Sequence, residues 1–96
     1  MLQHVMHKYD EMLDELMGAQ NYTKESKRAE SEEDRTMYAS MARQEVNHAD
    51  FLMKSLDRKI SEHDEENSKI AWHALRMHVC EWKSRILKEL EENEGR

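Results

Sequence analysis

The chain has 96 residues, 38% of them charged, and a formal net charge of −6 from 21 acidic and 15 basic residues. This length predicts a single domain with a thin core, which a partner chain or a metal would help to stabilise. Acids are interleaved among the lysines and arginines, which excludes the basic stripe that nucleic-acid binding requires. No apolar run reaches membrane-spanning length, and the single Cys80 excludes an internal disulfide framework. We therefore expect a cytoplasmic protein with no membrane partner.

The sequence contains no proline and only two glycines, Gly18 and Gly95, so long helices and an all-α fold are expected. The first helix is predicted at about residues 2–27, because apolar residues recur there at steps of three and four. These residues are Leu2, Val5, Met6, Tyr9, Met12, Leu13 and Leu16.

The second helix is predicted at about residues 32–61, with Ser31 as its N-cap and acidic residues in its first turn. Its apolar positions are Met37, Tyr38, Met41, Ala42, Ala49, Leu52, Leu56 and Ile60. The third helix is predicted at about residues 65–92, with Asp64 as its cap. Its apolar face consists of Trp72, Leu75, Val79, Trp82, Ile86 and Leu90.

Short polar connections between long amphipathic helices predict antiparallel neighbours, so residues 1–96 are interpreted as a single helical domain of three antiparallel helices. The first two helices form a hairpin whose apex lies near residue 30. Residues at equal distances from this apex lie at the same height, which pairs Glu15 with Glu45 and Tyr22 with Tyr38.

Glu45 and His48 interrupt a stretch that otherwise reads as the apolar side of the second helix. The positions three, four and seven residues from Glu45 hold Tyr38, Met41, Ala42, His48, Ala49 and Leu52. This pattern places Glu45 at the centre of the stripe expected to face the core. A buried ionised carboxylate is costly unless something neutralises it, and a metal ion is one such partner. A Glu and a His three residues apart point the same way, so both can reach one ion.

Glu15 flanks the apolar stripe of the first helix at the predicted height of Glu45 and His48. Two carboxylates and an imidazole suit iron, manganese or zinc, and bridging by glutamates favours iron or manganese. One hairpin supplies only half of a dinuclear site. The full pattern takes a Glu from each of two helices and Glu-x-x-His from two others, so two copies of the hairpin would complete it.

Three features of the chain resemble the ferritin-like superfamily: Glu15, the Glu45-x-x-His48 motif thirty residues later, and Tyr22 seven residues after the first Glu. The closest resemblance is to its short single-hairpin branch, the encapsulated-ferritin or rubrerythrin-like type, over about residues 9–57. In that branch two hairpins pair into a four-helix bundle, so the resemblance implies a homodimer or a higher even-numbered oligomer.

The same resemblance implies a di-iron ferroxidase centre between the chains, with Glu15, Glu45 and His48 as iron ligands. It implies two irons per dimer, with manganese or zinc as substitutes, and Tyr22 as a neighbouring tyrosine. Ferroxidation, or the handling of iron or peroxide, is the expected chemistry, with no catalytic residue beyond the ligands. The ending "LEENEGR" lacks the small apolar cargo tail of that branch, so an encapsulating shell is not expected.

Two alternatives stay open. The chain could be a non-catalytic helical interaction module, as in a small phage or regulatory protein, whose tryptophan-bearing third helix holds a partner. In that case Glu45 would pair with His48 or with an arginine. A turn near residue 63 would also bring His78 level with His48 and Glu81 level with Glu45, completing a site within one chain. Five of the eight methionines are interpreted as core filling: Met6, Met12, Met37, Met41 and Met53.

Overall fold

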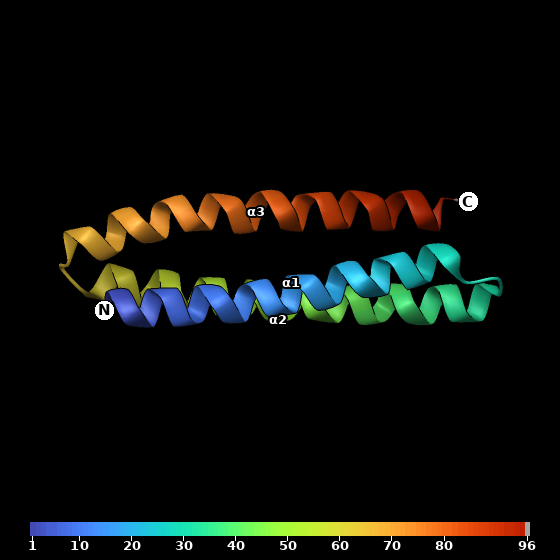
Figure 1. Ribbon diagram of the computed structural model, residues 1–96, viewed down its shortest axis with the longest axis horizontal. Coiled ribbons are helices and arrows are strands. Elements are labelled where there is room, and N and C mark those ends of the chain that lie inside the picture. Colours follow the sequence, from blue (N-terminus) through green and yellow to red (C-terminus); the bar gives the residue numbers. More distant parts are fainter. Residues whose placement is uncertain (96) are drawn as a thin grey trace.

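The computed structural model describes residues 1–95, and over this range it contains three helices and no strand. They are α1 (Leu2–Arg28), α2 (Glu32–Glu62) and α3 (Glu66–Glu94). The helices form a rod of 51 × 16 × 16 Å, in which α1 and α2 make an antiparallel hairpin and α3 returns alongside it (Figure 1). The predicted all-α fold is confirmed, and each predicted helix boundary lies within two residues of the observed one.

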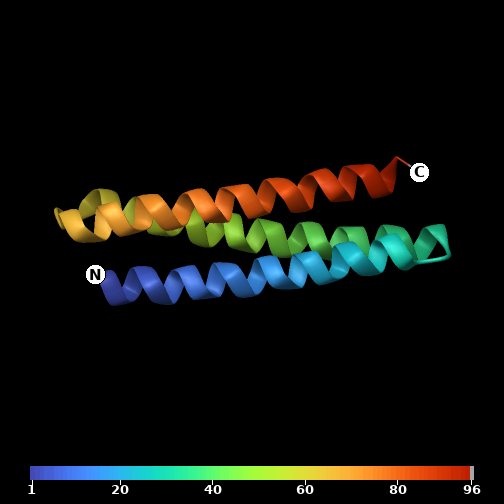
Figure 2. The ribbon, with the colours of Figure 1, turned by 45° about the horizontal axis from the view of Figure 1, so that its top comes forward.

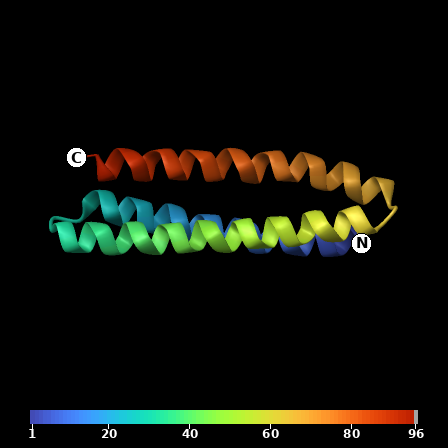
Figure 3. The ribbon, with the colours of Figure 1, turned by 180° about the vertical axis from the view of Figure 1, so that it is seen from behind.

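The turned views separate the three helices. Figure 2 shows α3 and α1 running in the same direction, with α2 antiparallel to both. Figure 3 shows the reverse side, where α2 passes in front of α1 and the two termini lie at opposite ends of the rod. None of the helices in the described range offers an apolar stretch of the length needed to span a membrane.

The connection between α1 and α2 is fixed by two hydroxyl groups. Ser31 accepts a hydrogen bond from the backbone N–H of Asp34 at 3.1 Å, so the predicted N-cap is confirmed. Ser26 donates to the backbone oxygen of Arg35 at 2.9 Å, which ties the end of α1 to the start of α2. These contacts set the apex of the hairpin and hence the register of the two helices.

Asp64 does not cap α3, contrary to the prediction. The residue before this helix is Glu65, which has extended backbone angles and makes no side-chain capping hydrogen bond. Asp64 lies one position too early to reach the first helical N–H groups. Its carboxylate instead lies 3.6 Å from Lys69 Nζ.

The core is one continuous apolar cluster along the rod axis. α3 reaches it through a narrow seam in which Trp72, Val79 and Ile86 are spaced by seven residues, as in a coiled coil. The hairpin supplies most of the rest: Val5, Met12, Leu16, Ala19, Ala39, Ala42, Val46, Ala49, Met53, Leu56 and Ile60. The four alanines let α1 and α2 approach closely.

The buried face of α2 is rotated from its predicted position. Val46, absent from the predicted stripe, is buried, and so is Met53, which was predicted to fill the core, whereas Met37 is 46% exposed. The reason is that α3 also packs against α2, so the residues of α2 that point toward α3 are buried. Met6 on α1 is 43% exposed, so Met6 and Met37 do not fill the core as predicted.

Candidate metal centre

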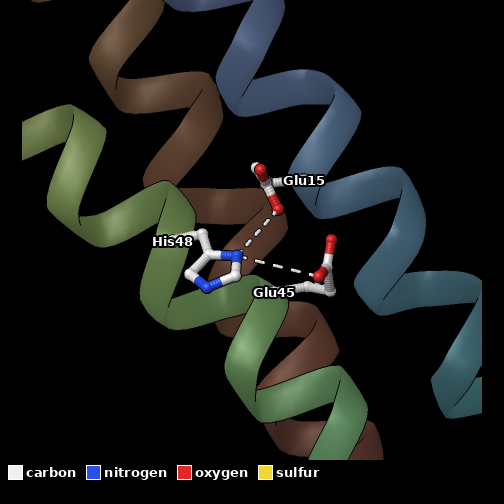
Figure 4. Close-up of side chains that lie close together, drawn as sticks. All are labelled: Glu15, Glu45 and His48. Carbon is white, nitrogen blue, oxygen red and sulfur yellow. Dashed lines mark hydrogen bonds and ion pairs between the residues drawn. The ribbon is translucent and has the colours of Figure 1, made fainter.

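Glu15 of α1 and Glu45 and His48 of α2 come together near the middle of the hairpin (Figure 4). Each offers one ligand atom, and these atoms all lie within 4.8 Å of one another. His48 Nδ1 lies 3.3 Å from Glu15 Oε2 and 3.7 Å from Glu45 Oε1. The equal heights expected from the hairpin apex are therefore observed.

The three side chains are partly exposed, which corrects one sequence expectation. The side chains of Glu15 and Glu45 are 29% and 27% exposed, and that of His48 is 60% exposed. Glu45 thus lies beside the buried stripe of α2, next to Val46, and not at its centre. The half-buried position still removes part of the water that would screen the charges of the two carboxylates.

The site lies on the side of the hairpin that α3 leaves uncovered. The side facing α3 is marked by its contacts: the Tyr9 hydroxyl lies 2.7 Å from His78 Nδ1, and Lys83 donates to Asp50 at 2.7 Å. With 3.6 residues per turn, Glu45 points about 140° away from Asp50 around α2. We call the uncovered side the open flank; its half-buried residues are Glu15, Gly18, Tyr22, Tyr38, Met41, Glu45 and Leu52, with His48 exposed beside them.

Glu15 influences the protonation of Glu45. The pKa of Glu45 is raised above its ordinary value, first because its carboxyl group hydrogen-bonds to that of Glu15. Partial burial and the negative charge of Glu15 raise this pKa further, while His48 acts in the opposite direction. A divalent cation bound between the carboxylates would cancel their repulsion. The donor set therefore fits a metal ion that prefers oxygen with one imidazole.

Tyr22 lies on the open flank, about two helical turns from Glu15. Its ring stacks on that of Tyr38, with centroids 6.4 Å apart and planes 25° apart. The pairing of these two residues by height is therefore confirmed. A role for Tyr22 beside a metal stays a prediction.

His78 and Glu81 do not join the three residues, so the single-chain alternative is wrong. His78 lies on the α1 side of α3, where it bonds to Tyr9 and stacks on Trp82 with a centroid distance of 6.1 Å. Glu81 is exposed on the far side of α3. Within residues 1–95, Glu15, Glu45 and His48 form the one group of three or more side chains placed so that they could hold a metal ion.

Sequence reasoning did not single out Gly18 as part of this site. It lies one turn after Glu15, and its backbone passes close to the Glu45 carboxylate. The signal that would identify Gly18 is a glycine inside a predicted helix, three residues from a predicted ligand.

The chain matched no protein-family model, no curated protein and no solved structure. The resemblance to the ferritin-like superfamily therefore continues to depend on the residues and their spacing.

Proposed function

We propose that the chain is a ferritin-like metal-binding protein whose open flank forms half of a carboxylate-bridged di-iron site. The observation that carries this proposal is the convergence of Glu15, Glu45 and His48, with donor atoms within 4.8 Å of one another. Two of these donors are oxygens and one is an imidazole nitrogen, the set that iron accepts in carboxylate-bridged sites.

The second half of the site would come from a second copy of the chain. One hairpin offers three donor residues, which is too few for two ions that each take more ligands. A second hairpin docked on the open flank would double this set and complete a four-helix bundle. Tyr22, Met41 and Leu52 are half-buried on the open flank, and a partner would cover them. A homodimer, or a higher even-numbered oligomer, follows from this arrangement.

The chemistry depends on what the chain's own residues do around the ions. Each bound Fe(II) would supply one electron, with dioxygen or peroxide as the electron acceptor. Glu15 and Glu45 would hold the ions and neutralise their charge, and His48 would hold them through Nδ1. The half-buried flank, closed by the partner, would limit access of water. Ferroxidation, or the handling of iron or peroxide, suits this environment, and manganese or zinc could occupy the same donors.

One observation favours the alternative, a non-catalytic interaction module. The outer surface of α3 exposes Ile70 by 61% and Met77 by 57%, one above the other two turns apart. Exposed apolar side chains in such a row are typical of surfaces that bind another protein. This proposal predicts that Glu45→Leu stabilises the chain and leaves partner binding intact.

The two functions are separated by an anaerobic titration with Fe(II), combined with the mass of the oligomer. The metal proposal predicts two irons per dimer, oxygen uptake on exposure to air and a ferric absorption band. Glu45→Ala should abolish binding, whereas the matched change Glu81→Ala, on α3, should preserve it. A wild-type chain that stays monomeric and binds no Fe(II) would rule out the metal proposal.

A further inference from the structure

Gly18 stands where helix formation gives no reason for a glycine. It lies in the interior of α1, far from either end, and its φ is not positive. Glycine at such a position destabilises a helix relative to alanine, because it loses more backbone freedom on folding. The explanation must therefore come from the space around it.

That space is occupied by Glu45. A Cβ atom built on Gly18 would lie 2.9 Å from Glu45 Oε2 and 3.6 Å from both Cγ and Cδ of the same side chain. The first distance is closer than real Cβ atoms approach a neighbour. The Glu45 side chain thus crosses from α2 over the bare backbone of α1. One oxygen lies above Gly18, while the other lies 3.7 Å from His48 Nδ1.

We propose that Gly18 is a positioning residue for the metal site, because its missing side chain admits the Glu45 carboxylate to the side of Glu15. This inference rests on the proposed function. The atom nearest the added Cβ is the far end of a flexible side chain, so alanine would displace the carboxylate and leave the helices in place. Metal sites need their ligands within about 0.5 Å of the productive position, which is the scale of this displacement.

The test uses Gly18→Ala in the full chain, with Met17→Ala as the matched control. Met17 is the preceding residue of α1 and is 54% exposed, so its truncation leaves the site untouched. Metal-free Gly18→Ala should unfold at the wild-type temperature or above it. Its affinity for Fe(II), titrated anaerobically, should fall by about 10–100-fold, as when supporting residues of metal sites are changed. Met17→Ala should keep the wild-type affinity.

A more stable variant that binds metal more weakly is the signature of positioning, because a purely structural role would lower both properties together. Wild-type affinity in Gly18→Ala would overturn the inference. Crystal structures of the metal-free wild type and Gly18→Ala separate this outcome from a failure of the proposed function. Glu45 turned away from residue 18 only in the variant supports the positioning role even if neither protein binds Fe(II). An unmoved Glu45 refutes it.

Discussion

The hairpin and α3 are held in the rod by different forces. Between α1 and α2 the interface is apolar and close, with buried alanines such as Ala19, Ala42 and Ala49 among larger side chains. α3 packs less closely, and mostly against α1. Its apolar seam is narrow and is flanked by polar contacts. Figure 1 shows α3 running along the length of the hairpin.

The polar contacts of α3 are specific but partly exposed. Asp57 accepts hydrogen bonds from Trp72 Nε1 at 2.7 Å and from Arg76 Nη2 at 3.0 Å. Trp82 donates to Gln20 at 3.0 Å, close to the other end of the seam. Partly exposed ion pairs contribute about 0–1 kcal/mol each, so they orient α3 more than they stabilise it. The hairpin is thus the stable unit, and it alone carries the candidate site.

The largest expected effect comes from the hairpin core. Leu16→Ala removes a fully buried side chain and should lower the free energy of unfolding by about 2–5 kcal/mol, toward the upper end because the close α1–α2 interface cannot collapse around the cavity. Ile86→Ala in the α3 seam should cost less, since the looser seam can close. Urea denaturation of both variants measures the difference. A larger loss for Ile86→Ala would reverse the ranking of the two regions.

The sequence predicted the hairpin better than it predicted the position of α3. Helical periodicity and the Ser31 cap located the apex, and the apex placed Glu15 level with Glu45 and Tyr22 level with Tyr38. This success has a physical reason: in a two-helix hairpin, height depends only on the number of residues from the turn. The proximity of the candidate ligands was therefore predictable without a structure.

The burial of Glu45 was not predictable in the same way. The pattern of a single helix does not reveal from which direction a third helix packs, so the centre of the buried stripe was misplaced. Asp50 and Asp57, which the sequence pattern did not single out, bind Lys83 and Arg76 of α3. The role of Gly18 was hidden for a related reason. It depends on the spacing between two helices, which periodicity does not report.

The pH dependence of the stability that Asp57 contributes tests how α3 is attached to the hairpin. Burial raises the pKa of Asp57, but hydrogen bonds from Arg76 and Trp72 and the charge of Arg76 outweigh this and hold it below its ordinary value of 3.8. A carboxyl group with a lowered folded-state pKa stabilises the fold above its ordinary pKa, and this contribution is lost as the pH falls through the folded value.

Asp57→Asn should therefore lower the free energy of unfolding at pH 7 by about 1 kcal/mol, allowing for solvent screening of this partly exposed pair. The difference from wild type should shrink as the pH falls below 3.8. Thermal unfolding between about pH 2 and 7, which spans the titration of carboxyl groups, measures this difference. Asp10→Asn, at an exposed position of α1, is the control. A difference that does not change with pH would assign the effect to lost packing.

The smallest effect is expected at the far end of α3, where Arg43 Nη2 lies 2.6 Å from Glu94 Oε1. Both side chains are more than 40% exposed, so Arg43→Ala should cost only about 0–1 kcal/mol and lose even that at high salt, which screens exposed charges. Hydrogen exchange of the last turns of α3, measured at low and high salt, should show this end opening while the hairpin amides stay protected. If the hairpin amides open together with the end of α3, the two regions form one cooperative unit, and the division between a stable hairpin and an accessory third helix fails.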